Sequence, residues 1–294
     1  MIQRALIVGT GLIGSSVGLA LRDAGFAGEI AGLDPNPAEL QTALARGAIS
    51  RTVSDAAAAD AQLIVLAGPV LSTLDWMERL APVCGPGTLI TDVGSTKLTI
   101  AQAAARLFPN AGPDGKTARF LPGHPMAGKE SGGAALAEAA LFRGAPWLFT
   151  PADASDAGLP AAHPLESEWR GWVTNFGARV LNLDAARHDE ICAWVSHLPQ
   201  MLSTALAALL EDTFAGDPEA REQIAAIGGR ALRETTRLGA SPYSMWRDVA
   251  LTNTEPIAQT LSALEQRLAH LRENLRTPEL REEFRLANHF RRRQ

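Results

Sequence analysis

Cysteine is scarce in this chain of 294 residues, and its 27 Lys and Arg are outnumbered by 32 Asp and Glu. The two cysteines, Cys84 and Cys192, lie far apart, and their spacing matches neither a disulfide framework nor a metal site. A formal net charge of −5 offers no basic face for a run of nucleic-acid phosphates. These shortages predict a cytoplasmic protein with no metal site, and they argue against nucleic acid as a partner.

Long uncharged segments are also rare, but residues 191–210 carry no Asp, Glu, Lys or Arg and could span a bilayer. The same run contains Ser196, His197 and Gln200, whose polar groups are costly against lipid. We therefore expect a central core helix and no membrane partner. Gly9 and Gly11 interrupt the apolar stretch near the start, so no targeting segment is expected either.

Apolar runs typical of strands alternate with helical patterns over the first 150 residues, and helical periodicity dominates afterwards. The runs cover residues 5–8, 29–33, 63–67, 88–93, 119–123 and 146–150. This order predicts an α/β fold with a Rossmann-type, doubly wound, mostly parallel sheet, followed by an all-α domain with at most a short strand near 178–183. Residues 152–164 resemble a linker. The predicted domains are therefore 1–164, which would bind a dinucleotide, and 165–294.

A glycine-rich turn directly follows the first run. Gly9, Gly11 and Gly14 form the pattern G-x-G-x-x-G at the head of a helical segment. The first glycine permits the tight turn, the second lets the backbone approach a pyrophosphate, and the third lets the helix pack closely on the strand. Leu12 and Ile13 would then begin the helix whose N-terminus receives the negative charge.

An acidic residue supports this interpretation. Asp34 ends the second run about 20 residues after the glycines, where a carboxylate binds the ribose hydroxyls of a dinucleotide. A carboxylate there repels a 2′-phosphate, and no Arg follows immediately in "DPNPAEL". The sequence therefore favours NAD over NADP. The alternative is a strand-to-helix turn that binds no ligand.

Two further polar segments follow predicted strands. "TDVGSTK" offers Ser95 as a hydrogen-bonding group and Lys97 as a cation, while "PGHPMAGKESGG" sets His124 between Gly and Pro. The second segment cannot be helical, so we expect the imidazole on an exposed loop, where it could take a proton near pH 7. Alternatively, Ser95 is a helix N-cap and His124 only bonds its own loop.

The segments "GTGLIGSS", "DVGSTK", "GHPMAGKESGG", "SHLPQ" and "MWRDVALTN" occur in an order that resembles the prephenate and arogenate dehydrogenases of tyrosine biosynthesis. This resemblance implies an NAD-dependent enzyme that oxidatively decarboxylates prephenate to 4-hydroxyphenylpyruvate. It further implies that His124 is hydrogen-bonded to the ring hydroxyl of the substrate and that Ser95 orients this hydroxyl.

The resemblance also implies substrate-binding residues in the helical half. Arg247 would bind a substrate carboxylate, His197 would line the pocket, and Gln200 would stand beside it. Because Gln200 is neutral, no carboxylate is evident there to pair with the ammonium of arogenate. Without the resemblance, an Arg247–Asp248 ion pair and a core histidine at 197 are the simpler interpretations.

Other functions remain open at this level. An arogenate or dual-substrate cyclohexadienyl dehydrogenase would share all these motifs. A 3-hydroxyacid dehydrogenase usually relies on a lysine in its helical half, but no lysine follows Lys129. A non-catalytic NAD-sensing module is the alternative from another class. The apolar helices exceed what a helical half of this size can bury, so a homodimer is expected, as the resemblance also implies.

Overall fold

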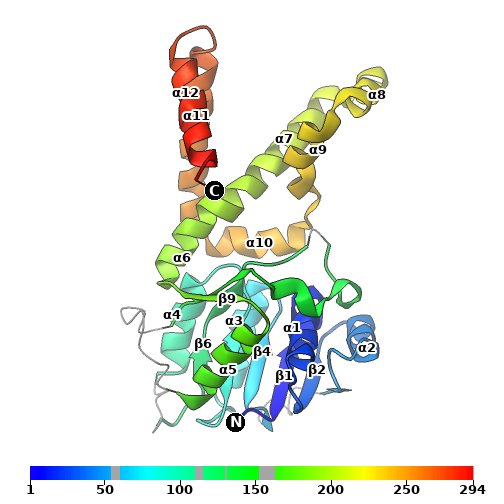
Figure 1. Ribbon diagram of the computed structural model, residues 1–294, viewed down its shortest axis with the longest axis vertical. Helices are drawn as coiled ribbons and strands as arrows, with labels where there is room; N and C mark the ends of the chain where they lie inside the picture. The colour runs from blue at the N-terminus through cyan, green and yellow to red at the C-terminus, as the bar shows by residue number, and fades with distance from the viewer. Residues whose placement is uncertain (54–59, 110–114, 130, 152–162, 294) are drawn as a thin grey trace.

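The computed structural model describes residues 1–53, 60–109, 115–129, 131–151 and 163–293. An α/β unit forms the base of the molecule in Figure 1, and two helical arms rise from it. A six-stranded parallel sheet lies at the centre of this unit, in the order β3-β2-β1-β4-β5-β6. The strands are β1 (Arg4–Val8), β2 (Glu29–Leu33), β3 (Arg51–Thr52), β4 (Leu63–Leu66), β5 (Leu89–Asp92) and β6 (Arg119–Leu121). The Rossmann-type prediction is confirmed, and the strand order reverses between β1 and β4, where such sheets bind ligands.

Helices cover both faces of this sheet. Alternate residues of β1 belong to opposite cores: Ile7 packs with residues of α1 and α5, and Leu6 with residues of α3 and α4. Strands buried on both faces form continuous apolar runs, which is why the sequence revealed them. The helices of this unit are α1 (Leu12–Asp23), α2 (Pro37–Ala45), α3 (Val70–Leu80), α4 (Leu98–Leu107) and α5 (Pro164–Asn175).

A second, three-stranded sheet has the order β7-β8-β9. β7 (Gly123–Pro125) pairs antiparallel with β8 (Pro146–Phe149), which pairs parallel with β9 (Arg179–Asn182). The predicted run 119–123 is thus divided between two sheets, while the short strand expected near 178–183 is present. Two 3-10 turns, η2 (Ala134–Leu136) and η3 (Ala139–Phe142), precede β8.

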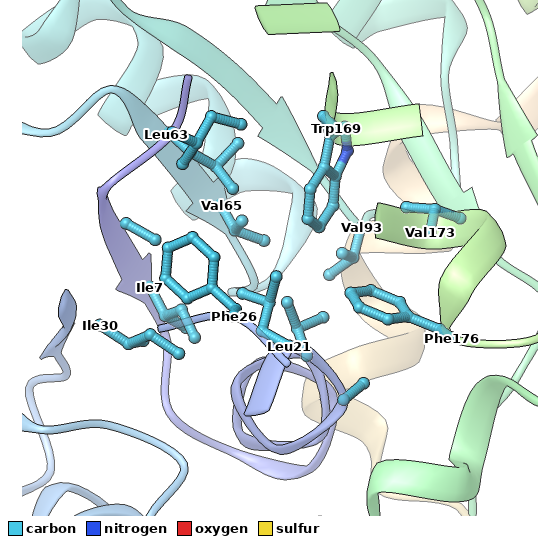
Figure 2. Close-up of a cluster of buried hydrophobic side chains, with 14 of the residues drawn as sticks. Ile7, Leu21, Phe26, Ile30, Leu63, Val65, Val93, Trp169, Val173 and Phe176 are labelled. Carbon is cyan, nitrogen blue, oxygen red and sulfur yellow. The ribbon is translucent and has the colours of Figure 1, made fainter. Parts of the chain in front are cut away.

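Helix α5 belongs to the core of the α/β unit. Figure 2 shows Trp169, Val173 and Phe176 directed toward Leu21 of α1 and Val65 of β4. Of the predicted linker, residues 152–162 lie outside the described part of the chain. The predicted domain boundary at 164/165 therefore stays a prediction, and the packing of α5 and β9 extends the mixed α/β structure to residue 182.

The second half is helical, as predicted. Helix α10 lies across the junction between the α/β unit and the arms and packs against α3 (Figure 1). The elements are α6 (Ala185–Cys192), a π-helical turn η4 (Ala193–His197), α7 (Leu198–Phe214), α8 (Pro218–Ile227), α9 (Gly229–Thr236), η5 (Arg237–Ala240), α10 (Tyr243–Thr252), α11 (Thr254–Glu273) and α12 (Glu279–Arg291).

The uncharged segment 191–210 is not a core helix of the single chain, so this prediction is wrong at that level. In α7, Gln200 and Ser203 are buried, but Leu202 is exposed and Leu209 is 62% exposed. The helix rises away from the sheet as part of an arm (Figure 1), which leaves much of its apolar surface without intramolecular cover. Within the described ranges, no helix is long and apolar enough to cross a membrane.

Candidate active site

The glycine-rich turn between β1 and α1 has room for a ligand at one glycine only. A Cβ at Gly9, which has φ +93°, would lie 2.8 Å from the Ala67 backbone, and one at Gly14 would lie 1.9 Å from the Gly9 carbonyl oxygen. A Cβ at Gly11 would meet nothing within 4 Å. Gly9 and Gly14 are thus required by packing, whereas the space at Gly11 is open to a ligand.

The N-terminus of α1 faces this open space. Gly11 is its N-cap, no side chain caps the helix, and its first turn holds no acidic residue. The backbone N–H groups at this end, where Leu12 and Ile13 begin the helix, are therefore available to an anion. A pyrophosphate fits such a terminus in both charge and backbone approach.

Asp34 follows β2 directly and lies beside the glycine turn. Its Oδ2 accepts from the Thr10 amide at 2.7 Å, and its Oδ1 accepts from the Asn36 amide at 2.8 Å. Oδ2 also accepts from the Thr10 hydroxyl at 3.3 Å. Since each carboxylate oxygen has two lone pairs, the unused lone pair is on Oδ1, which can accept from a ribose hydroxyl. The turn, the helix terminus and this carboxylate together fit a dinucleotide.

His124 does not lie on an exposed loop, as the sequence led us to expect, but in strand β7. It pairs with Leu148 of β8, and only 9% of its surface is exposed. The strand is anchored at its start because the Gly123 amide donates to Asp92 Oδ1 at 3.1 Å. Instead of bonding its own loop, the ring places Nδ1 2.9 Å from Nε2 of His188.

Lys97 and Asp92 form a fully buried ion pair beside this strand. Lys97 is therefore not a surface cation, and Asp92 also accepts from the Gly94 amide at 2.7 Å. Burial holds the pKa of His124 well below its usual value, and the positive charge of Lys97 lowers it further. His124 is consequently neutral at pH 7 and can act as a hydrogen-bond acceptor.

Ser95 lies at the same edge as His124. It is partly exposed, in the loop between β5 and α4, and β5 contacts β7. The structure therefore brings the loop of Ser95 and the strand of His124 together, while the catalytic roles of both residues stay predictions.

Buried polar residues connect this edge to the helical half. His188 Nδ1 lies 2.8 Å from Asp189 Oδ1, and Asn253 Nδ2 donates to the Asp189 carbonyl oxygen at 2.9 Å. The same Asn253 nitrogen lies 3.1 Å from Nδ1 of His197. Burial lowers the pKa of His197 to about 4. His197 is thus a satisfied buried histidine, and its ring packs edge-on against Trp246.

Trp246 also lines a pocket of about 520 Å³, which we call the α7–α10 pocket. Gln200 contributes a fixed amide, whose Nε2 donates to the Leu238 carbonyl oxygen at 2.7 Å and whose Oε1 accepts from Ser241. The remaining lining residues are Met201, Thr204, Gly239, Ser241, Tyr243, Arg247, Ala250 and Leu251. The pocket wall is mostly apolar, with a few polar groups, as in sites for small organic molecules.

Arg247 supplies the positive charge of this pocket. Its side chain is 49% exposed, and its Nε and Nη2 donate to Asp248 Oδ1 at 2.9 and 2.8 Å. Asp248 is buried and also accepts from the Leu71 amide of α3 at 3.1 Å. The ion pair considered at the sequence level therefore exists, and it fixes the guanidinium at the pocket. Gln200 and Arg247 line the same pocket, whereas His197 is not among its lining residues and contacts Trp246.

The roles of His188 and Asp189 were not predicted from the sequence. The available signal was the pair "HD" close before the uncharged run 191–210, because polar side chains that become buried require hydrogen-bond partners. Nor did the sequence indicate that His124, His188 and Cys192 each place a potential metal-ligand atom within 4.8 Å of the others. Hydrogen bonds already connect these groups through His188 Nε2, which lies 2.9 Å from His124 and 3.5 Å from Cys192.

Both halves of the chain match models of known protein families. Residues 17–163 match the family model described as "Prephenate dehydrogenase, nucleotide-binding domain", and residues 184–292 match "Prephenate dehydrogenase, dimerization domain". The chain belongs to the prephenate dehydrogenase family. Its helical half is thus of the family's dimerization type, and its α/β half of the nucleotide-binding type.

Individual members of the prephenate dehydrogenase family are similar over most of the chain. The prephenate dehydrogenase of Lactococcus lactis is 33% identical over 92% of this chain, which spans 70% of that relative. The crystal structure of Aquifex aeolicus prephenate dehydrogenase with hydroxyphenyl propionate and NAD+ is 26% identical, has a TM-score of 0.85, and is matched over 100% of this chain and 98% of that one. Synechocystis arogenate dehydrogenase is 28% identical with a TM-score of 0.75, over 99% of both chains.

Proposed function

We propose that this chain catalyses the NAD-dependent oxidative decarboxylation of prephenate to 4-hydroxyphenylpyruvate, a step toward tyrosine. The observation that carries the proposal is the buried, neutral His124, positioned at the edge of a nucleotide-binding sheet and linked through buried residues to a pocket containing Arg247. Family membership supplies the substrate class. Two buried, free cysteines agree with a reducing compartment, the cytoplasm.

The glycine turn and Asp34 would hold the cofactor. Gly9 and Gly14 shape the turn, Gly11 leaves space for the pyrophosphate, and Leu12 and Ile13 begin the helix that receives its charge. Bound NAD would accept a hydride from the ring carbon of the substrate. Asp34 would bind the ribose hydroxyls and repel a 2′-phosphate.

His124 would accept the proton of the substrate's ring hydroxyl, and Ser95 would orient that hydroxyl. A neutral imidazole has one lone pair and can accept directly. As hydride leaves the carbon, the hydroxyl proton becomes strongly acidic, so a histidine with a low pKa is a sufficient acceptor. The resulting dienone loses carbon dioxide and becomes aromatic, which needs no further base.

The α7–α10 pocket would hold the polar end of the substrate. Arg247 would bind a carboxylate, because a guanidinium presents two parallel N–H groups to its two oxygens. His197 would shape the pocket through its contact with Trp246. Gln200 is neutral and its amide is already occupied by Leu238 and Ser241, so it offers no anion to an ammonium group. This favours prephenate over arogenate.

We further propose that the chain acts as a homodimer assembled through its helical arms. The second half matches a family model described as a dimerization domain. Between α7 and α11 lies an apolar groove, and exposed apolar side chains continue along both arms. They include Leu202, Leu209, Leu261, Leu268, Phe284 and Phe290. Burial of this surface against a second copy would remove it from water.

The decisive experiment compares kcat/KM for prephenate and arogenate, each with NAD and with NADP. We expect prephenate with NAD to be the best pair, with release of carbon dioxide. Preference for arogenate would assign the chain to the arogenate branch of the family. Binding of NADH without turnover of either substrate would instead support a non-catalytic NAD-sensing dimer.

A further inference from the structure

Three buried side chains form a continuous hydrogen-bonded row that ends at His124. His124 Nδ1 lies 2.9 Å from His188 Nε2, and His188 Nδ1 lies 2.8 Å from Asp189 Oδ1. His188 is fully buried, and Asp189 is nearly so. The row runs from Asp189 and His188 in α6 of the helical half to His124 in β7 of the α/β unit, so it crosses the junction between them.

The carboxylate end of the row faces hydrogen-bond donors. Asp189 Oδ1 accepts from the Lys97 amide at 2.7 Å, and Oδ2 accepts from the Leu98 amide at 2.9 Å. These amides lie at the N-terminus of α4, which favours a negative charge. An ionised carboxylate can only accept hydrogen bonds. The hydrogen between Asp189 and His188 therefore belongs to His188 Nδ1.

This assignment determines which of the other ring nitrogens of His188 and His124 carry a hydrogen. A neutral imidazole carries one N–H, so the His188 ring has its lone pair on Nε2. Cys192 Sγ lies 3.5 Å from the same Nε2, and burial raises the pKa of this thiol to about 12, so it too presents a hydrogen. His188 Nε2 is consequently an acceptor, and His124 Nδ1 must donate to it. The lone pair of His124 is then on Nε2.

We propose that His188 and Asp189 are positioning residues that hold His124 in the tautomer with an unprotonated Nε2. The inference rests on the proposed function, in which His124 accepts the hydroxyl proton. Without the row, His124 would divide its population between two tautomers, and the form with a protonated Nε2 cannot accept. When Nε2 takes the proton, His124 becomes an imidazolium, and the Asp189 carboxylate stabilises its charge through His188 without taking a proton itself.

Two substitutions of His188 distinguish a role in positioning His124 from a role in packing alone. In His188→Gln the side-chain amide reaches the position of Nε2, so its oxygen can still accept from His124. In His188→Asn the shorter amide reaches only the position of Nδ1, so the bond to Asp189 can persist while that to His124 is lost. We expect His188→Asn to lower kcat for prephenate roughly 10²-fold, with KM and NAD affinity nearly unchanged, and His188→Gln to retain most of kcat.

A spectroscopic readout that does not depend on turnover accompanies the kinetics. Nitrogen NMR of ¹⁵N-histidine-labelled protein resolves the two tautomers, and the His124→Asn variant assigns one of the six histidines. We expect His124 to show an unprotonated Nε2 in the wild type and in His188→Gln, and a mixture of tautomers in His188→Asn.

The proposal is overturned if wild-type His124 has a protonated Nε2, or if both His188 variants lose activity equally and in step with their stability to urea. It is also overturned if His188→Asn keeps wild-type kcat. Failure of the proposed function has a different signature, because the wild type would then not oxidise prephenate although the NMR could still show the fixed tautomer.

Discussion

The imidazole of His197 and the indole of Trp246 meet edge to face, with ring centroids 5.8 Å apart and planes at 83°. Trp246 lines the α7–α10 pocket, while His197 is linked through Asn253 to Asp189 and the row that ends at His124. This ring contact therefore joins the α7–α10 pocket to the buried polar residues that lead to His124 of β7. Residues far apart in sequence are thereby held in one arrangement.

Replacement of His124 by Asn should lower kcat roughly 10²- to 10⁴-fold, the usual contribution of a general base. Asn keeps an amide near the position of Nδ1 that can still bond His188, but it has no atom at the position of Nε2. Steady-state kinetics with prephenate measures the effect, and NADH binding serves as the control for folding. A kcat near that of the wild type would remove His124 from the mechanism.

Asp34 should determine cofactor choice. We expect the wild type to use NAD far better than NADP, and Asp34→Asn to narrow this difference by removing the repulsion of the 2′-phosphate. The measurement is kcat/KM for both cofactors at saturating prephenate. Because the Asp34 carboxylate also accepts from the Thr10 amide, thermal unfolding of the variant controls for damage to the turn. Equal use of NAD and NADP by the wild type would contradict the assignment.

The inner strands of the large sheet were predictable because they are buried on both faces, whereas the edge strand β3, whose two residues are exposed, matched no predicted run. The runs at 63–67 and 88–93 contain β4 and β5, whose residues are buried throughout. The glycine turn was predictable for a related reason, since the close contacts at Gly9 and Gly14 permit no other residue there without rearrangement. The apolar runs and the glycine spacing are visible in the sequence itself, although Gly9 packs against the distant Ala67.

The environment of His124 was not predictable in this way. Its flanking Gly123 and Pro125 suggested a loop, but pairing with β8, more than 20 residues later, makes the segment a strand. Its partner His188 is 64 residues away in the sequence. Contacts between distant segments depend on how the two halves pack, and no local pattern encodes that packing.

The arms should associate two copies of the chain at micromolar concentration. Light scattering should give twice the 31.1 kDa mass of the chain. Leu268→Glu, in the groove between α7 and α11, should shift the mass toward the monomer because it places a charge on the apolar surface. Leu44→Glu, at an exposed position of α2, is the matched control and should leave the mass unchanged. A monomeric wild type would refute the homodimer.

Stability should fall as the pH is lowered from 6.5 to 4. Burial lowers the pKa of His197 to about 4 in the folded chain, whereas the ordinary value is 6.5. Between these values the unfolded chain binds a proton that the folded chain does not, so acid favours unfolding, by up to about 3 kcal/mol. Urea unfolding gives the free energy of unfolding at each pH. This free energy should change less with pH for His197→Asn than for the wild type. The control His289→Asn, on the surface of α12, should show the same pH dependence of the free energy of unfolding as the wild type.

Exchange of Arg247 for Lys should raise KM for prephenate while NAD affinity stays almost unchanged. The charge is conserved, so any loss reports geometry: the Arg247 fork is held by two bonds to the buried Asp248, an arrangement that a lysine ammonium cannot reproduce. Loss of a charge-assisted contact costs about 1.5–3 kcal/mol, or roughly ten- to a hundredfold in kcat/KM. Arg230→Lys, in an exposed ion pair on α9, is the matched control and should behave as the wild type. If NAD binding weakens instead and prephenate kinetics hold, Arg247 serves the cofactor or the fold, and the substrate carboxylate must bind elsewhere.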